Sequence, residues 1–317
     1  MKSTRNSKFF MTGLLLFALS SVFWSGDFLW TLDSFVILNI RVPRVLMGFF
    51  SGATLACTGL FFQALFRNPL ASPFTLGSAS SASFGATISL FFFSGHSFFG
   101  FLSLTSLFAF LFSFLSIFFI YAIWKMSGKK KVTDLLLSGV ILTYVFSSGI
   151  LLIQSFSDSN TVSQITVWMM GGIDILGLEK PIFLGLILLI TLPFLYRLLL
   201  VMDLISHSEK LSLSKGLQLD SIYKKVLFIC SFLSAVTVSM TGPIGLVGLL
   251  SPHFSKKLFG ARMSANFVPN LLIGGCFVAI SDGMLRFLFP ERLIPVGVMT
   301  SFLGGIFFLY LLLKKET

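Results

Sequence analysis

Long apolar stretches recur along this chain, and they constrain its fold more than any other feature. The first runs from Phe9 to Trp24 and the last from Val296 to Leu313, and neither contains a charged residue. A bilayer core about 30 Å thick requires about 20 consecutive apolar residues to cross it as a helix. Charged residues make up only 11% of the sequence, against about 25% in soluble domains, and mean hydropathy is +0.94. The sequence therefore predicts an all-α integral membrane protein.

The apolar stretches predict ten transmembrane helices in a single transmembrane domain that covers residues 1–317. They are expected at about residues 9–26, 42–66, 73–93, 98–125, 133–156, 181–201, 222–241, 246–258, 267–288 and 296–313. The eighth is too short to cross a membrane as a straight rod, and it follows a Gly/Pro-rich turn over residues 242–248. Non-helical backbone at membrane depth is tolerated only where it is buried in protein or lines a cavity.

The first apolar stretch resembles a signal peptide, because Lys2, Arg5 and Lys8 precede it. No clear small-x-small cleavage site follows, and further apolar stretches do. We therefore expect the stretch to remain as the first transmembrane helix.

Basic residues predict the orientation. With the N-terminus inside, the predicted outside segments hold five Lys and Arg residues, which leaves 18 of the 23 inside. Short inside loops are enriched in Lys and Arg in membrane proteins. This asymmetry and the even number of helices predict a multi-pass protein of the inner (cytoplasmic) membrane with both termini cytoplasmic. The same asymmetry accounts for the net charge of +11, so no nucleic-acid partner is expected.

Motifs for catalysis or metal binding are absent from the sequence. Cys57, Cys230 and Cys276 lie far apart in apolar runs and are expected to pack in the interior, and the three histidines are isolated. Because there is no P-loop motif, the chain is not expected to hydrolyse ATP, and we predict a transport subunit that is not itself an enzyme and needs no cofactor. A stand-alone secondary carrier and a membrane-embedded enzyme are the rival classes.

Two segments suggest an inverted internal repeat. ATLACTG at residues 53–59 is similar to AVTVSMTG at residues 235–242, on the second and seventh predicted helices. Five helices separate them, so they run in opposite directions, as in many transporters.

Several ordered motifs between residues 40 and 313 resemble one known family. They are RVPR at 41–44, QALFRNPLA at 63–71, LLLSGV at 135–140, WMMGG at 168–172, GPIGLVGLLSPH at 242–253 and PVGVMT at 295–300. The chain is similar to the ABC-importer permeases that carry iron–siderophore complexes, haem or cobalamin. The resemblance implies ten helices per subunit and a second permease copy, expected as a homodimer. It also implies two separate ATPase subunits and an extracytoplasmic substrate-binding protein.

The resemblance assigns roles at both faces of the membrane. Outside, Arg41, Arg44 and Arg286 are expected to dock glutamates of the binding protein, since guanidinium groups grip carboxylates through paired hydrogen bonds. Headgroup anchoring is the alternative. Inside, the polar loop over 202–225 is expected to couple to the ATPase, and a solvated loop is the alternative. Its matching residues are His207, Glu209, Ser212, Lys215 and Gly216.

The resemblance also places a cytoplasmic gate and a pathway. The gate residues are Asn68, Pro69, Leu70, Val132 and Thr133, for which a turn and a helix cap by Thr133 are the simpler interpretation. The residues expected to line the pathway carry hydroxyl groups, and they are Ser138, Thr143, Ser147, Ser148, Thr300 and Ser301. An apolar path with hydroxyls suits a large, already chelated ligand. The expected substrate is an iron–siderophore or haem, with cobalamin as the alternative.

Overall fold

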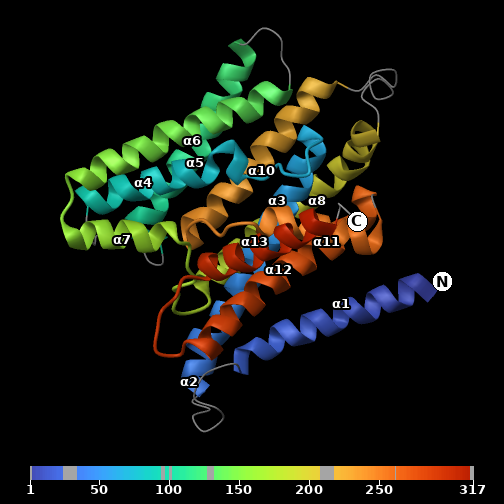
Figure 1. The fold of residues 1–317 in the computed structure, drawn as a ribbon, viewed down its shortest axis with the longest axis horizontal. Coiled ribbons are helices and arrows are strands. Elements are labelled where there is room, and N and C mark those ends of the chain that lie inside the picture. Colours follow the sequence, from blue (N-terminus) through green and yellow to red (C-terminus); the bar gives the residue numbers. More distant parts are fainter. Residues whose placement is uncertain are drawn as a thin grey trace.

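The computed structural model describes residues 2–23, 34–93, 97–99, 102–126, 132–207, 218–260 and 262–314. These residues form a bundle of helices with one short hairpin (Figure 1). The long helices are α1 (Lys2–Ser20), α3 (Val42–Phe66), α4 (Ser78–Phe92), α5 (Leu104–Met126), α6 (Val132–Ser155), α7 (Ser159–Met169), α8 (Glu179–His207), α10 (Leu219–Thr241), α11 (Val247–Phe259), α12 (Met263–Leu288) and α13 (Val296–Lys314). The short elements are η1 (Ser21–Phe23), α2 (Ser34–Val36), η2 (Ile37–Arg41), η3 (Phe74–Leu76), β1 (Ser97–Phe99) and β2 (Leu102–Ser103).

Each of the ten predicted helices coincides with an observed one, but several boundaries differ. The third begins at Ser78, because Pro73 opens the short helix η3 and Gly77 reverses the chain at a φ of 75°. The fourth begins at Leu104, because the antiparallel strands β1 and β2 occupy the expected start. The short helix α7 was not predicted.

Six helical segments of the described chain are long and apolar enough to cross a membrane, so a count of ten spans is not confirmed. They are Ser34–Phe66, Leu104–Met126, Asp134–Ser155, Glu179–Ile205, Leu219–Thr241 and Met263–Leu288. The apolar parts of α1 and α13, Met11–Ser20 and Val296–Tyr310, are shorter. With 13 residues, α11 is too short to cross alone, as the sequence indicated.

Helix α3 lies at the centre of the bundle, buried along most of its length, and packs closely against the antiparallel α12. Small residues make this approach possible. A Cβ atom on Gly52 would overlap the carbonyl oxygen of Gly274, and one on Gly48 would lie 3.2 Å from the Cα of Ala279. Helices in lipid commonly associate through such small residues spaced four apart. This contact fixes the register of α3 against α12.

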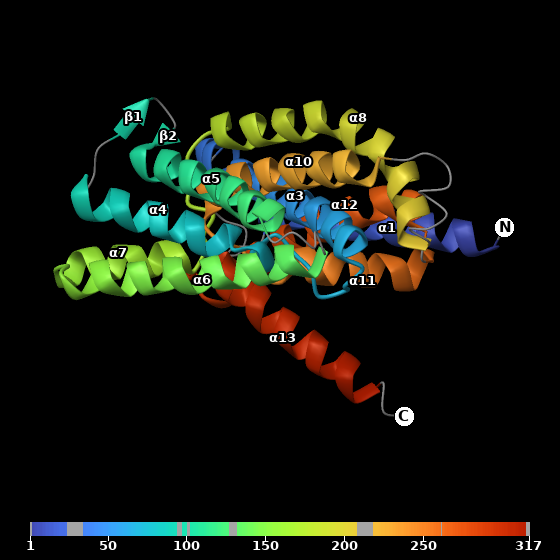
Figure 2. The ribbon, with the colours of Figure 1, turned by 90° about the horizontal axis from the view of Figure 1, so that it is seen from above.

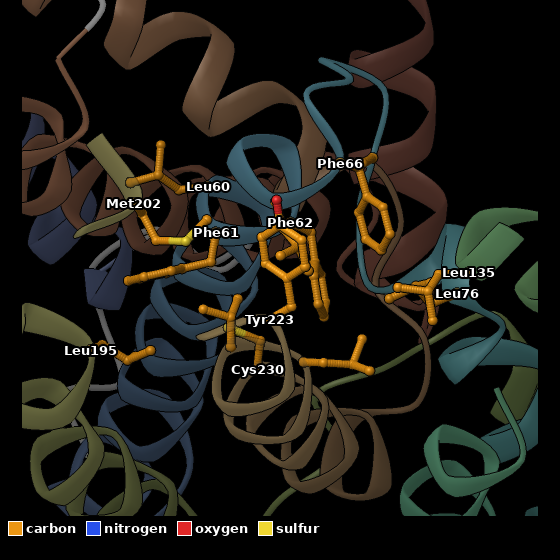
Figure 3. Close-up of a cluster of buried hydrophobic side chains, with 14 of the residues drawn as sticks. Leu60, Phe61, Phe62, Phe66, Leu76, Leu135, Leu195, Met202, Tyr223 and Cys230 are labelled. Carbon is orange, nitrogen blue, oxygen red and sulfur yellow. The ribbon is translucent and has the colours of Figure 1, made fainter. Parts of the chain in front are cut away.

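The two ends of α3 provide reference points for the rest of the molecule. Near its last residues, a hydrophobic cluster joins α3 to α8 and α10 and to the start of α6 (Figure 3). Figure 3 shows Phe61 and Phe62 of α3 in this cluster with Met202 and Tyr223. We call this side of the molecule the Arg67 end and the opposite side the Arg44 end. The start of α1 and the end of α13 both lie toward the Arg67 end (Figure 1).

The chain between α10 and α11 is non-helical, as the Gly/Pro-rich turn predicted. Gly242 and Leu246 have positive φ angles of 66° and 63°. Backbone hydrogen bonds hold both ends of this segment: the Gly172 amide donates to the carbonyl of Thr241, the last residue of α10, at 2.7 Å, and the Val247 amide donates to the carbonyl of Gly245 at 2.9 Å. Irregular backbone at membrane depth requires such partners.

Candidate functional site

A buried carboxylate with two arginines dominates the Arg44 end. Asp282 of α12 is fully buried, whereas the side chains of Arg44 and Arg286 are 16% and 17% exposed. The Nε–H of Arg44 donates to both carboxylate oxygens of Asp282, at 3.0 and 3.2 Å. The Nε–H of Arg286 donates to one of them at 3.1 Å, and a terminal nitrogen of Arg286 donates to the carbonyl of Ser21 at 3.1 Å. The arrangement joins α3 and α12 to η1, the short helix that follows α1.

Helix geometry explains why these side chains meet. Asp282 and Arg286 are four residues apart on α12 and therefore share a face of the helix. Arg44 lies one turn before Gly48 on α3, and Gly48 lies against Ala279 of the antiparallel α12. One further turn along each helix therefore brings Arg44 to Asp282. Two of the three arginines expected to dock a partner are thus also engaged within the subunit.

Arg41 completes the cluster. It is the last residue of η2, it is half-buried, and its charge acts on Arg286. The neighbouring residue Asn39 accepts a backbone hydrogen bond from Gly177, just before α8, at 2.9 Å. The segment that carries Arg41 is therefore held against the rest of the Arg44 end.

At the Arg67 end, two polar contacts hold the last turn of α8. A terminal nitrogen of Arg67 donates to the carbonyl of Ile205 at 2.9 Å. The carboxylate of Asp203 accepts the amide N–H groups of Met263 (2.7 Å) and Ser264 (3.1 Å) and so caps the start of α12. Of the predicted coupling residues, only His207 lies in the described chain, as the last residue of α8. Those at 209, 212, 215 and 216 lie outside the described residues.

The predicted gate residues also lie at the Arg67 end. Asn68 bends the chain after α3, since its side-chain oxygen accepts the Leu70 amide at 2.9 Å and its carbonyl accepts the Ala71 amide at 3.0 Å. Leu70 is 58% exposed. Helix α6 begins at Val132, so Thr133 lies inside its first turn.

A polar cavity of about 290 Å³ adjoins this turn. Gln63, Arg67, Asn68 and Lys256 contribute to its lining, and the Lys256 ammonium donates to the Gln63 side-chain oxygen at 3.0 Å. Within the described residues, no three His, Cys, Asp or Glu side chains are grouped so that they could hold a metal ion.

The predicted pathway residues divide between buried and exposed positions. Ser138 and Thr300 are buried, and each hydroxyl donates to a carbonyl of its own helix, at 2.7 Å and 3.1 Å. Thr143 and Ser147 are half-buried, and Ser148 and Ser301 are exposed.

The outward faces of α6 and α13 are otherwise apolar. Tyr144, Leu151, Phe302 and Leu309 are all more than half exposed. Figure 2 shows α13 projecting from the body of the molecule, with α6 and α7 along the same side. An apolar surface of this kind requires lipid or another protein chain to cover it.

Sequence reasoning missed Asp282 and Asp203. A carboxylate within an apolar segment is a signal in its own right, because ionisable residues in membrane helices are rare and are usually paired. The spacing of Asp282 and Arg286 also indicates a pair on one helix face.

Comparisons with known proteins identify the family. Residues 10–314 match the model of the FecCD transport family. The molybdate import system permease protein MolB of Haemophilus influenzae is 32% identical over 282 residues, which is 89% of this chain and 82% of that protein. A probable iron chelatin transport system permease protein of Helicobacter pylori is 33% identical over 285 residues, 89% of this chain and 84% of that protein.

A solved structure agrees with this assignment. The inward-facing conformation of a metal-chelate type ABC transporter superposes with a TM-score of 0.86 at 29% sequence identity, and the match covers 97% of this chain and 99% of the other. The fold, the ordered motifs and the match over nearly the whole chain lead to one conclusion. This chain belongs to the FecCD transport family of ABC-importer permeases.

Proposed function

We propose that the chain forms the translocation pathway of a binding-protein-dependent importer for a chelated iron compound, an iron–siderophore or haem. The observation that carries this proposal is the character of the exposed faces of α6 and α13. Between Leu135 and Ser155, and between Val296 and Leu313, the sequence contains no charged residue. Ser148 and Ser301 add exposed hydroxyls to these faces. An apolar surface with hydroxyls suits a large ligand that already encloses its metal.

Other cargoes make different demands on the pathway. A free oxyanion such as molybdate carries charge and requires hydrogen-bond donors or cations along its route. Cobalamin is large and chelated like an iron–siderophore, so it remains the alternative cargo. The relatives do not distinguish between these substrates, because the relative named for molybdate and the one named for an iron chelate are almost equally similar to this chain.

The proposed assembly contains two copies of this chain, two ATPase subunits and an extracytoplasmic binding protein in the inner membrane. The Arg67 end would face the cytoplasm, together with both termini, and the Arg44 end would face outward. The location of basic segments supports this orientation, because Arg67, Lys256 and Lys257 lie at the Arg67 end. Arg41, Arg44 and Arg286 would then receive the binding protein.

Reconstitution tests the proposal. Proteoliposomes that contain the chain, its ATPase and its binding protein should take up labelled iron–siderophore or haem only with ATP inside. The chain alone should hydrolyse no ATP. Cobalamin and molybdate serve as competing cargoes in the same assay, and preferential uptake of either would overturn the iron assignment. Uptake by the chain without any ATPase would favour a stand-alone carrier.

A further inference from the structure

Asp282 accepts hydrogen bonds from Arg44 and Arg286 at the same edge of each guanidinium group, the edge that carries Nε. Both Arg44 and Arg286 reach the carboxylate through Nε, the nitrogen nearest the backbone. Within the described residues, Arg44 makes its hydrogen bonds through Nε alone, which leaves both terminal nitrogens as donors. Arg286 uses one terminal nitrogen on the carbonyl of Ser21. The buried carboxylate therefore holds the inner edge of each group and leaves outer donors unused.

The cluster also keeps a positive charge. Within the described residues, the charges of Arg41 and Arg44 both act on Arg286, and Asp282 is the carboxylate that pairs with Arg44 and Arg286, so the guanidinium groups outnumber the carboxylate that they pair with. Guanidinium groups bind a carboxylate best when two N–H groups point at it in parallel. Arginine side chains lose much rotamer freedom when they bind, and a fixed orientation reduces that cost.

We infer that Asp282 is a positioning residue for partner docking: it fixes Arg44 and Arg286 with their terminal nitrogens directed toward carboxylates of the extracytoplasmic binding protein. This inference rests on the proposed function. If the arginines only anchored the protein to lipid headgroups, they would not need a buried carboxylate to fix their orientation. Partner docking gives Asp282 that role.

A competing explanation is that Asp282 only reduces the positive charge. The two explanations predict opposite signs for Asp282→Asn, which keeps the size of the side chain and removes its charge. If only charge matters, the substitution makes the cluster more positive by one unit, so an acidic partner should dock faster and more tightly at low salt. If positioning matters, docking should weaken through faster dissociation, because the substitution leaves one acceptor oxygen and an NH2 group that cannot accept, so the two guanidinium groups are no longer both held.

The experiment measures docking of the purified, fluorescently labelled binding protein to the permease–ATPase complex in lipid nanodiscs, at low and high salt. We expect Asp282→Asn to raise Kd at least tenfold, mainly in the dissociation rate, and to do so at both salt concentrations. Asp174→Asn is the matched control, because Asp174 is exposed in the segment before α8 and its substitution makes the same change in charge. Unchanged or tighter docking in Asp282→Asn would overturn the inference.

A second variant decides the question if Asp282→Asn does not assemble. Arg44→Lys keeps both the charge and Asp282 but lacks the planar fork. We expect a similar loss of docking, and unchanged docking would exclude positioning. Arg44→Gln distinguishes a failure of the docking proposal from a failure of the positioning proposal. If the binding protein docks normally to the Arg44→Gln variant, the arginines are not the docking surface and that part of the proposed function fails. If it loses docking while Asp282→Asn and Arg44→Lys do not, only the positioning role fails.

Discussion

The carboxylate of Asp203 accepts the amide N–H of Met263 at 2.7 Å, and this contact joins the end of α8 to the start of α12. Helix N-termini carry unpaired N–H groups and a partial positive charge, so a carboxylate there is stabilising. The cap comes from a different helix, four residues before the end of α8. The end of α8 and the start of α12 are therefore held together.

The first prediction tests this cap. Asp203→Ala should lower the free energy of unfolding by about 0.5–2 kcal/mol, because the first N–H groups of α12 lose their acceptor. Asp203→Asn should recover part of the loss, since its side-chain oxygen still accepts one hydrogen bond. Denaturation in mixed micelles measures both variants. Equal stability of Asp203→Ala and the wild type would show that water replaces the carboxylate without cost.

The second prediction concerns the contact between α3 and α12. Gly52→Ala places a Cβ against the carbonyl of Gly274, so the two helices must move apart. We expect a loss of about 1–3 kcal/mol, as for other overpacked interiors, and a lower thermal midpoint of the purified protein. Gly305→Ala is the matched control, because no atom lies within 4 Å of a Cβ at that position. Similar midpoints for the two variants would contradict the packing argument.

The positions of most helices were predictable, because a long apolar run in the sequence indicates a membrane helix. Helix α7 was not predicted, because Ser159–Met169 mixes polar and apolar residues over only 11 positions. The boundary of α4 depended on the Pro73–Gly77 turn, whose residues the predicted helix had included.

The candidate sites were predictable in part. The sequence motifs predicted that Arg41, Arg44 and Arg286 lie at the outside face of the membrane. The approach of Arg44 to Asp282, however, depends on the register of α3 against α12. That register follows from Gly48, Gly52 and Gly274, whose contacts are tertiary. The same limit applies to Asp203, whose partners lie 60 and 61 residues further along the chain.

The third prediction concerns docking at the Arg44 end. Arg41→Glu should weaken binding of the partner about tenfold or more, because a negative charge then faces its carboxylates. Arg41 is a cleaner test than Arg44, whose reversal to Glu would also place a second carboxylate beside the buried Asp282. Association kinetics at low and high salt give the readout. Arg292→Glu, an exposed residue with the same change in charge, is the control. Normal docking and transport in Arg41→Glu would leave this arginine as a membrane anchor.

The last prediction concerns coupling to the ATPase through residues 206–219. Hydrolysis in another subunit moves this chain only if a contact between them differs in the two states. The loop follows directly from the turn of α8 that Asp203 and Arg67 hold to α12 and α3. Glu209→Lys or Gly216→Val should therefore uncouple ATP hydrolysis from transport while the protein still inserts and assembles.

Cysteine cross-linking to the ATPase checks the same surface. The native cysteines at 57, 230 and 276 are buried, so single cysteines introduced over 206–219 should react against a low background. Cysteines at 127–131, in the basic segment between α5 and α6, are the control. We expect cross-links from 206–219 that change in extent when ATP is added, because the contact itself must differ between the two states. If no position there cross-links and both variants transport normally, the loop is a solvated linker. The coupling surface would then lie elsewhere, with the basic segment 256–262, which spans the last turn of α11 and the residues before α12, as the next to test.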